Sequence, residues 1–504
     1  MRRGSGLKNN TPARCIAVFG TGSDVGKSVV ATGICRLLHR QGIRVAPYKA
    51  QNMSNNSGVT PEGLEMGRAQ IVQAEACHLS PHVDMNPILL KPTSDVGSQV
   101  VLLGEARSNQ TATEYHRQKD GFFQTACGAL DRLRQNSDAV VIEGAGSCAE
   151  VNLAAHDIVN FRMAEYAEAP VILVADIHRG GVFAQIVGTL ACLEEERRRR
   201  VAGFIVNRFR GDLRLFENGV EWIEQKTGKP VFGVLPWYRH FVIDQEDSVV
   251  IEQPERVNSS LNGQAVVGVI RIPHISNFTD FDPLQAVEGL RVAFLEKVQT
   301  LDGFQAIILP GSKNTRADLN WLHESGWAAI IRRFSESGGH VLGVCGGYQM
   351  IGTVVHDPDG LEGRPGRTDG LALLPVETVL QAPKTTTLTC FRWDGIKGRG
   401  YEIHMGQTRR GPAESLVQVF ERNGAACQDD DGCQAAGGRV IGTYLHGLFD
   451  TPDIVRKWLT IIGLGHLVVG SLPGLMARHQ AYEDLADHME QHLDMAAIAA
   501  LLRI

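Results

Sequence analysis

The stretch HVLGVCGGYQMI, residues 340–351, combines an apolar run with a cysteine set between glycines. The run predicts a buried strand that ends in a sharp turn into a helix. Its pattern Gly343-x-Cys345-x-Gly347 has the form of a nucleophile elbow, with sulfur in place of a serine oxygen. Amides at the start of the following helix would favour the thiolate, which is the reactive form of cysteine. The alternative is a buried structural cysteine, as most intracellular cysteines are.

A second stretch favours a catalytic cysteine. AIILPGSKNT, residues 306–315, predicts another strand that runs into a Gly-Ser turn. Amides at Gly311 and Ser312 would form an oxyanion hole, and Gly346 would supply a further donor.

The stretch RVIGTYLHGLFD, residues 439–450, predicts a third short strand with His446 at its end. A lone histidine is more often a packed or surface residue. A histidine that shares a chain with a cysteine elbow and a Gly-Ser turn is a candidate base for Cys345.

These three motifs together resemble a class I glutamine amidotransferase domain. The resemblance implies that Cys345 attacks the side-chain amide of glutamine and that ammonia is released. The family's usual third member is a glutamate two residues after the histidine, whereas this chain has Leu448 there. The chain therefore resembles the subgroup that works with a Cys–His pair, and Asp450 is a candidate orienting carboxylate.

Composition narrows the function class. The 504 residues suffice for two or three domains with full cores. The net charge is −6 and no half of the chain is markedly basic, so nucleic acid is not an expected partner. Ten cysteines without CxxC pairs suit a reducing cytoplasm better than a disulfide framework or a zinc site. The polar N-terminus does not resemble a signal peptide, and no apolar run is long enough for a bilayer, so we expect a cytoplasmic location and no membrane partner.

Near the N-terminus, an apolar strand at residues 15–19 runs into GTGSDVGKS, residues 20–28, and a helix is predicted over residues 29–38. This is the context of a phosphate-binding loop, in which Lys27 supplies charge and Ser28 can ligate Mg²⁺. The spacing from Gly20 to Gly26 is one residue longer than in the standard motif. The alternative interpretation is a glycine-rich turn without function. The loop resembles the variant of dethiobiotin synthetase and its relatives, which use ATP to activate a carboxylate. From this motif and this resemblance, the predicted nucleotide-binding residues are Thr21, Gly22, Val25, Gly26, Lys27 and Ser28.

Further strands recur at helix-sized intervals, at residues 43–48, 139–143, 171–176, 203–207 and 231–235. This alternation predicts a mostly parallel sheet with helices on both faces and ligands at the carboxyl ends of the strands. Glu143 and Asp176 end two of these strands, so we expect them to bind Mg²⁺ with Ser28, although either alone could be a strand-end cap. In the enzymes that the loop resembles, an Asn in the place of Asn207 contacts adenine.

An amide-rich stretch follows the second strand: YKAQNMSNNS, residues 48–57, with GLEMGRAQ at residues 63–70. Amide side chains donate and accept, which suits a ligand with many carboxylates and amides. These stretches resemble the cobyric acid synthase family, the glutamine-dependent enzymes of cobalamin synthesis. One departure is His178, where the family's DIxRGG motif has Asp. The predicted substrate-binding residues are Gln51, Asn52, Asn55, Asn56 and Glu65.

The resemblance implies a reaction in which ATP activates a carboxylate as an acyl phosphate and ammonia from glutamine displaces the phosphate. The implied substrate is adenosylcobyrinic acid a,c-diamide, amidated at its b, d, e and g carboxylates. One alternative is the sister a,c-diamide synthase, which the stretch 48–57 argues against. Another is a regulatory ATP-binding protein with a vestigial amidotransferase domain, which intact Lys27, Ser28, Cys345 and His446 argue against.

The expected fold is α/β: a P-loop-type, mostly parallel sheet domain, then a flavodoxin-like class I glutamine amidotransferase domain and a helical tail. We place the polar loop RIPHISNFTDFDPL, residues 271–284, near the domain interface. The segment GYEIHMG, residues 400–406, is read as a strand that lines the glutamine pocket or the ammonia path, or as a plain edge strand. The predicted boundaries are a polar arm at 1–14, an ATP- and corrinoid-binding domain at 15–250, a linker at 251–264, the amidotransferase domain at 265–455 and a helical extension at 456–504.

Overall fold

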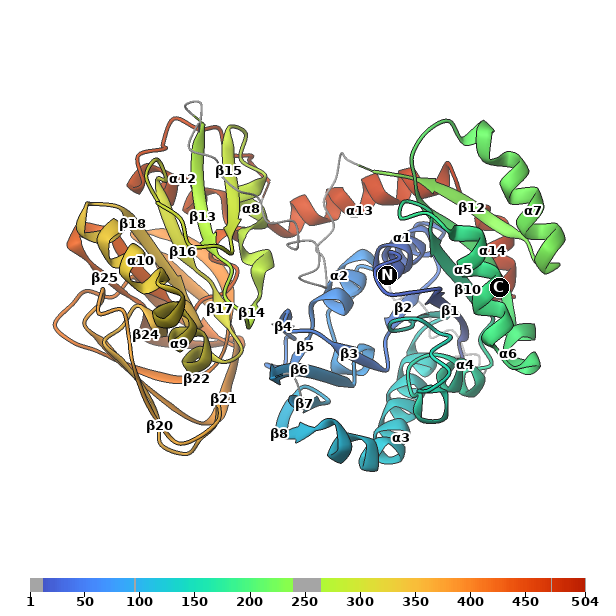
Figure 1. Cartoon of the computed structure of the whole chain (residues 1–504), viewed down its shortest axis with the longest axis horizontal. Coiled ribbons are helices and arrows are strands. Elements are labelled where there is room, and N and C mark those ends of the chain that lie inside the picture. Colours follow the sequence, from blue (N-terminus) through green and yellow to red (C-terminus); the bar gives the residue numbers. More distant parts are fainter. Residues whose placement is uncertain (1–11, 95–96, 239–263, 473, 504) are drawn as a thin grey trace, which may run out of the picture.

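The computed structural model describes residues 12–94, 97–238, 264–472 and 474–503, which form two lobes (Figure 1). We call residues 12–238 the N-terminal lobe and residues 264–472 the C-terminal lobe. Most of the predicted arm and of the predicted linker lies outside the described residues. None of the helices within the described ranges combines the length and the apolar character needed to cross a membrane.

The N-terminal lobe is built on a six-stranded parallel sheet of order β12-β11-β10-β1-β9-β2. Its strands are nearly uninterrupted apolar runs, as expected where helices cover both faces. This confirms the predicted parallel sheet. The strands are β1 (Arg14–Gly20), β2 (Val45–Tyr48), β9 (Ala139–Glu143), β10 (Val171–Asp176), β11 (Val201–Phe209) and β12 (Val231–Pro236).

The helices of this lobe lie between its strands in the sequence. They are α1 (Lys27–Arg40), α2 (Arg68–Ala76), α3 (Ala112–Asn136), α4 (Phe161–Tyr166), α5 (Val182–Cys192), α6 (Glu195–Arg200) and α7 (Glu217–Thr227). A capping box starts α3, because the Thr111 side chain accepts from the Glu114 backbone N–H and the Glu114 carboxylate accepts from that of Thr111.

Two small sheets extend the N-terminal lobe toward the other lobe, and the sequence did not predict them. One has the order β3-β6-β7-β8, and the other is the antiparallel hairpin of β4 and β5. Their strands are β3 (Gln51–Met53), β4 (Ser57–Val59), β5 (Glu65–Gly67), β6 (Ile88–Ser94), β7 (Gly97–Leu102) and β8 (Glu105–Thr111). The amide-rich stretch therefore lies on the side of this lobe that faces the other lobe (Figure 1).

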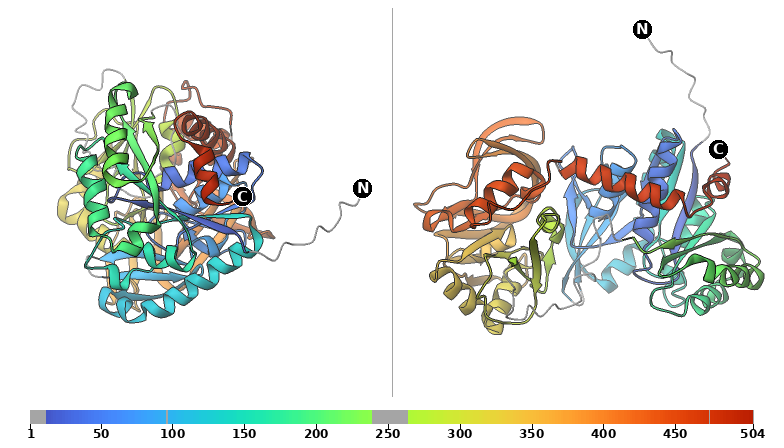
Figure 2. Two further views of the ribbon diagram at one scale, coloured as in Figure 1. Left: turned by 90° about the vertical axis from the view of Figure 1, so that its right-hand side faces the viewer. Right: turned by 90° about the horizontal axis from the view of Figure 1, so that it is seen from above.

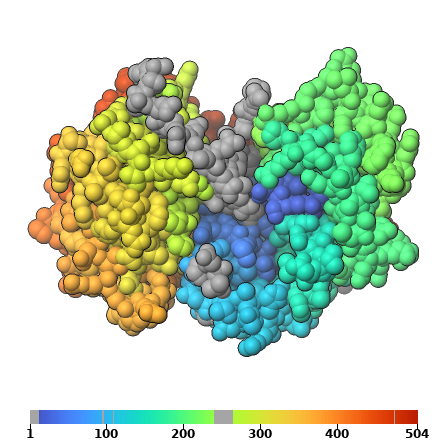
Figure 3. Space-filling model, in the orientation of Figure 1, coloured from blue at the N-terminus to red at the C-terminus, as the bar shows by residue number. Residues whose placement is uncertain are grey.

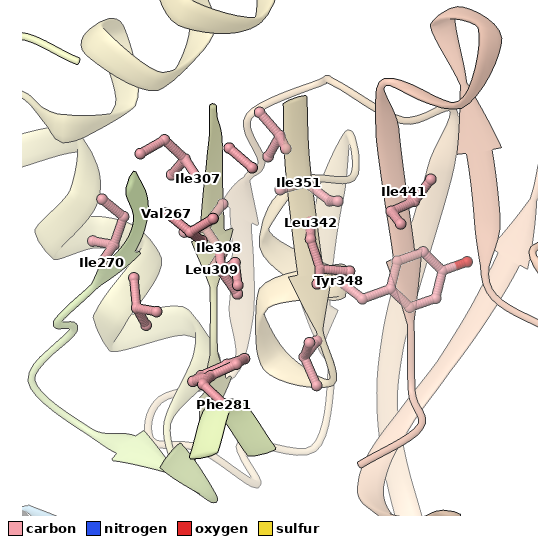
Figure 4. Close-up of a cluster of buried hydrophobic side chains, with 14 of the residues drawn as sticks. Val267, Ile270, Phe281, Ile307, Ile308, Leu309, Leu342, Tyr348, Ile351 and Ile441 are labelled. Atoms are coloured by element: carbon pink, nitrogen blue, oxygen red, sulfur yellow. The ribbon is translucent and has the colours of Figure 1, made fainter. Parts of the chain in front are cut away.

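The C-terminal lobe has a sheet of order β15-β13-β16-β18-β26-β25, parallel except at its β25 edge. Branched side chains of three neighbouring strands, such as Val267, Ile308 and Leu342, pack with Phe281 and Tyr348 in its core (Figure 4). The strands are β13 (Ala265–Ile270), β15 (Leu290–Leu295), β16 (Ala306–Leu309), β18 (His340–Val344), β25 (Cys433–Ala435) and β26 (Val440–Thr443); the helices are α8 (Asp282–Gln285), α9 (Thr315–Ser325), α10 (Trp327–Glu336) and α11 (Gly346–Met350). A two-residue pairing joins β14 (Ile275–Ser276) to β17 (Gly311–Ser312).

A second sheet is inserted between β18 and β25, and of its long antiparallel strands only the segment 400–406 was predicted as a strand. It follows the order β20-β19-β21-β23-β24, and β22 pairs with β21. The strands are β19 (Val354–Asp357), β20 (Gly366–Asp369), β21 (Val376–Trp393), β22 (Ile396–Arg410), β23 (Val417–Arg422) and β24 (Ala425–Asp431).

The last helices connect the two lobes. After α12 (Pro452–Ile461), helix α13 (Gly474–Glu490) crosses from the C-terminal lobe to the N-terminal lobe, and α14 (Met495–Leu501) ends there (Figures 1 and 2). Helix α13 packs closely on α1, since a Cβ at Gly33 would meet the Met489 Sδ at 2.0 Å. Arg478 forms ion pairs both with Glu75 on α2, at 3.0 Å, and with Asp450 of the C-terminal lobe, at 3.1 Å.

Candidate active sites

Cys345 lies at the sharp turn between β18 and α11. Its φ of 51° and ψ of −106° are unusual for a residue with a side chain and match the strained geometry of a nucleophile elbow. The Cys345 backbone N–H donates to the Thr443 carbonyl at 2.8 Å, which fixes the turn to β26. A Cβ at Gly347 would lie 1.9 Å from the Leu309 carbonyl oxygen, so only glycine fits there.

His446 lies beside this cysteine and is held by a carboxylate that the sequence analysis missed. Its Nδ1 is 2.7 Å from Asp280 Oδ2, and Asp280 Oδ1 accepts from the Gly447 N–H at 3.0 Å. The prediction that Asp450 orients the histidine is wrong, because the Asp450 carboxylate bonds Arg478 instead. Asp280 lies in the 3-10 helix Phe278–Phe281, within the polar loop that was placed near the interface.

The charge on His446 depends on these neighbours. Burial alone would lower the pKa of the imidazole. The negative charges of Asp280 and Cys345, together with side-chain hydrogen bonds to both, overcome this and raise the pKa to about 10. The imidazolium form therefore predominates at neutral pH.

The three predicted oxyanion-hole residues lie together at this site. A Cβ at Gly346 would meet the Ser312 backbone nitrogen at 2.7 Å, and one at Gly311 would meet the His446 Cε1 at 3.1 Å. The Ser312 hydroxyl donates to Asp318 at 2.6 Å, which fixes the Gly-Ser turn to the start of α9.

Strand β22 forms another wall of the Cys345 site. The Cys345 thiol lies 3.6 Å from the Ile403 carbonyl, and the backbones of Tyr401 and His446 exchange hydrogen bonds of 3.1 and 2.8 Å. The Tyr401 ring also stacks on the imidazole, with centroids 5.2 Å apart. The segment 400–406 is therefore no plain edge strand, since β22 contacts both residues of the pair.

The phosphate-binding motif forms the loop between β1 and α1. Gly26 has a φ of 92°, which favours glycine, and it caps the helix that starts at Lys27. The Lys27 ammonium donates to the carbonyls of Gly22 and Gly146, at 3.0 and 2.8 Å, and so lies over the loop.

Buried polar groups surround Glu143 at the end of β9. Its carboxylate accepts from the Ser28 hydroxyl at 2.8 Å, from the Lys49 ammonium at 3.1 Å and from the Gln73 amide. Asp176, at the end of β10, instead accepts from Arg208 at 2.9 Å. The structure thus joins two of the three predicted metal ligands directly. Among the described residues, no three His, Cys, Asp or Glu side chains gather as a metal-binding group.

The remaining nucleotide-binding predictions fall around the same loop. The Asn207 amide donates to the Val25 carbonyl at 2.9 Å and lies against Gly26. The Thr21 hydroxyl lies 3.4 Å from the Val174 carbonyl and from the Gln185 side chain. All these residues border the carboxyl edge of the parallel sheet.

Several side chains of the amide-rich stretch lie in the interior of the protein. Asn52 is buried and donates to the Gln70 side chain at 3.1 Å, and Gln51 accepts from the Tyr115 hydroxyl. The Asn55 side-chain oxygen is shielded from solvent and has no hydrogen-bond partner among the described residues. Asn56 is buried as well.

Glu65 is the centre of a buried ion cluster between the lobes. One carboxylate oxygen accepts from Lys91 at 2.7 Å, and the other accepts from Lys384 of strand β21 at 2.6 Å. Burial alone would raise the pKa of Glu65, but the two lysines hold it far below its usual range. Burial, only partly offset by Glu65, lowers the pKa of Lys91 to about 8.

Both lobes match known protein families. A model for the CobB/CobQ-like glutamine amidotransferase domain matches residues 266–454. A model for the CobQ/CobB/MinD/ParA nucleotide binding domain matches residues 16–248.

Relatives that match over nearly the whole chain identify the family to which the two lobes together belong. Cobyric acid synthase of Chlorobaculum tepidum is 50% identical over 493 residues, covering 96% of this chain and 97% of that protein. The cobyric acid synthases of Chlorobium phaeobacteroides and Syntrophobacter fumaroxidans are 48% and 45% identical, cover 99% and 97% of this chain, and are each covered over 99% of their own length. The chain belongs to the cobyric acid synthase family. This confirms the predicted function class, glutamine-dependent amidation in cobalamin biosynthesis.

Several polar residues of this cobyric acid synthase family member were not singled out from its sequence. Three of them lie in or next to segments that the sequence analysis described: Asp280, Lys49 and Gln73. Their partners are distant in the chain. The sequence signal for Asp280 was weak: it is one of two aspartates in the polar loop 271–284.

Proposed function

We propose that this chain amidates the b, d, e and g side-chain carboxylates of adenosylcobyrinic acid a,c-diamide, using ATP and glutamine. The observation that carries the proposal is the amide-rich stretch 48–57. It begins at the end of β2, beside Glu143, and ends at Ser57, whose N–H bonds Asn277 of the C-terminal lobe at 2.9 Å. A ligand held by this stretch would lie between the phosphate-binding loop and the Cys345 site.

In the C-terminal lobe, the proposed nucleophile is the Cys345 thiolate, paired with the His446 imidazolium. The thiolate attacks the glutamine side-chain carbonyl, and backbone amides at Gly311, Ser312 and Gly346 stabilise the oxyanion. His446 gives its proton to the leaving ammonia and later takes one from the attacking water, while Asp280 holds its ring in place.

In the N-terminal lobe, the proposed reaction is phosphoryl transfer from ATP to a carboxylate of the corrinoid. Lys27 and the loop amides at Thr21, Gly22, Val25 and Gly26 bind the phosphates, and Asn207 borders the adenine side. Oxygen ligands and a buried carboxylate suit Mg²⁺, so Ser28 and Glu143 fit as its ligands and Asp176 is a third candidate. The metal would neutralise charge that develops on the phosphates.

The proposed substrate contacts are Gln51, Asn52, Asn55 and Asn56, whose amides can pair with a carboxylate or with the amide that replaces it. Both oxygens of Glu65 already accept from lysines of this chain. We therefore propose that Glu65 serves the substrate indirectly, by fixing the hairpin of β4 and β5.

The experiment is turnover of the purified chain with the a,c-diamide, MgATP and amide-¹⁵N-labelled glutamine, followed by mass spectrometry of the corrinoid. We expect four labelled amides to appear in each product molecule. A chain that leaves the diamide unchanged but converts cobyrinic acid to its a,c-diamide would be the sister synthase instead. Absence of any ATP-dependent amidation would refute both.

A further inference from the structure

One hydrogen bond joins the amide-rich stretch of the N-terminal lobe to the loop that carries Asp280. The Ser57 backbone N–H donates to the Asn277 side-chain oxygen at 2.9 Å, and both residues are buried, with exposed fractions of 1% and 3%. In Figure 3 the blue surface of the first hundred residues lies against the yellow C-terminal lobe, between it and the green part of the N-terminal lobe.

Asn277 is directly coupled to the carboxylate that holds His446. It has a φ of 51°, a left-handed conformation that Asn tolerates better than most residues, and it stands immediately before the 3-10 helix. The Asp280 N–H donates to the Asn277 carbonyl at 3.0 Å. An anchor on the Asn277 side chain therefore fixes the turn from which Asp280 reaches His446.

At the other end of this hydrogen bond, Ser57 is bonded to buried charged side chains. The Ser57 hydroxyl donates to Glu65 at 2.8 Å and accepts from Lys91 at 2.7 Å. Lys384 binds the second Glu65 oxygen from the C-terminal lobe. The hairpin of β4 and β5 is thus held against the C-terminal lobe by a buried cluster of one carboxylate, one hydroxyl and two lysines.

The same hairpin leads directly to the nucleotide site. Helix α2 starts at Arg68, one residue after β5, and its Gln73 donates to Glu143. Glu143 in turn accepts from Ser28. One continuous segment, residues 57–76, therefore bonds Asn277 near one end and, through Gln73, bonds Glu143, the partner of Ser28, near the other.

We propose that Asn277 is a positioning residue through which the N-terminal lobe completes the glutaminase site. The hydrogen bond from Ser57 fixes the side chain of Asn277. Asn277 in turn fixes the position of Asp280, and Asp280 orients the His446 ring. Glutamine hydrolysis then responds to the ligands of the N-terminal lobe, so that ammonia is released when a carboxylate is ready to receive it. This inference rests on the proposed division of labour between the lobes.

The test compares two substitutions with opposite effects on the bond. Asn277→Gly keeps the left-handed backbone and removes the acceptor, whereas Asn277→Asp keeps an acceptor in the same place. The matched control is Asp394→Gly, which changes another left-handed residue, in the exposed turn between β21 and β22. Each protein is assayed for glutamate release from glutamine, with and without MgATP and the a,c-diamide.

For Asn277→Gly we expect glutaminase kcat to fall about 10- to 100-fold, as for other residues that orient a catalytic ligand. We also expect the KM for glutamine to stay close to that of the parent chain and the stimulation by MgATP and diamide to be lost. Asn277→Asp is expected to keep most of the glutaminase kcat and most of the stimulation. Asp394→Gly is expected to behave as the parent chain.

Amidation supported by ammonium salts serves as the reporter of folding and of the N-terminal reaction. Retained ammonia-supported amidation in Asn277→Gly, with lost stimulation, supports the inference. Parent-like stimulation in Asn277→Gly would overturn it, and so would an Asn277→Asp protein as impaired as Asn277→Gly. If the parent chain itself lacks ammonia-supported amidation, the proposed function fails and not the role of Asn277.

Discussion

His446 and Asp280 are 166 residues apart in the chain, yet the imidazole Nδ1 and a carboxylate oxygen lie 2.7 Å apart in the buried site. In the proposed mechanism this carboxylate takes the place that glutamate has in the usual amidotransferase triad, but it comes from a loop at the lobe interface. The order of the three residues in the chain is Asp280, Cys345, His446. Triads are recognised by geometry and not by sequence order, and this one follows that rule.

Asp280→Asn is expected to lower glutaminase kcat by about 10²- to 10⁴-fold, because the amide no longer holds the imidazolium or its tautomer. Loss of the negative charge also lowers the pKa of His446, which is now about 10. The alkaline limb of the pH–rate profile of glutamine hydrolysis therefore moves to lower pH. An unchanged alkaline limb would show that Asp280 does not act on the histidine.

The same pKa predicts how stability depends on pH. His446 has a folded-state pKa above its ordinary 6.5, so its contribution to stability is complete below about pH 6.5. That contribution is lost as the pH rises through 10. Urea unfolding at several pH values is expected to show a loss between pH 7 and 10 that is smaller in Asp280→Asn.

Cys345→Ser is expected to abolish amidation from glutamine and to leave amidation from ammonia, because only the nucleophile of one lobe is lost. The measurement is corrinoid mass after turnover with each nitrogen source. Failure with ammonium salts at high pH, where neutral ammonia is abundant, would contradict the division of labour between the lobes.

Lys27→Ala is expected to remove amidation from both nitrogen sources, since the phosphates lose charge stabilisation in the transition state. Glutamate release by the C-terminal lobe without nucleotide serves as the control for folding. Full ATP-dependent amidation in this variant would mean that the loop between β1 and α1 does not bind the reacting nucleotide.

Glu65→Gln is expected to destabilise the protein by about 3–5 kcal/mol, because it leaves Lys91 and Lys384 buried without a counter-charge. The midpoint of urea unfolding, followed by a probe in each lobe, measures the change. The control is Glu105→Gln, which breaks the exposed pair with Arg107 and is expected to shift the midpoint little. An equal shift in both variants would show that the buried cluster is no stronger than a surface pair.

Replacing Asn55 and Asn56 by Ala is expected to weaken corrinoid binding and to let partly amidated corrinoids accumulate. Uncharged amides can hold both the acid and its amide product, whereas the Ala variant holds neither. Mass spectrometry during turnover detects the partial amides, and nucleotide-free glutaminase activity is the control. A parent-like corrinoid KM would place substrate recognition elsewhere.

The parallel sheet of the N-terminal lobe was predictable in detail. The predicted bounds of β9 and β10 coincide with Ala139–Glu143 and Val171–Asp176. Buried parallel strands are continuous apolar runs ended by polar or glycine residues, and that signal is local. The elbow at Cys345 was predictable for the same reason, since its glycines stand next to it in the sequence.

Other features depended on contacts that no local pattern contains. Strand β21 runs from Val376 to Trp393, and its sequence alternates short polar and apolar stretches. That pattern does not distinguish a strand from a loop. What makes it a strand is its pairing with β22, which exists only in the folded chain. Asp280 lies in a loop without periodicity, and its role comes from His446, far along the chain. The apolar positions of α13 predicted a helix, but they did not show that its partner would be α1.

The position of α13 and α14 has a consequence for the order of folding during synthesis. Tyr482, Leu485, Met489 and Ile498 belong to the same core cluster as Val30 and Ile34 of α1. The ribosome makes the first four only after it has synthesised the whole C-terminal lobe. The N-terminal lobe therefore keeps one face of its phosphate-binding helix uncovered until translation has passed residue 498. A nascent chain that stalls before that point would expose apolar surface on the lobe that was made first, so chaperones would be expected to bind there.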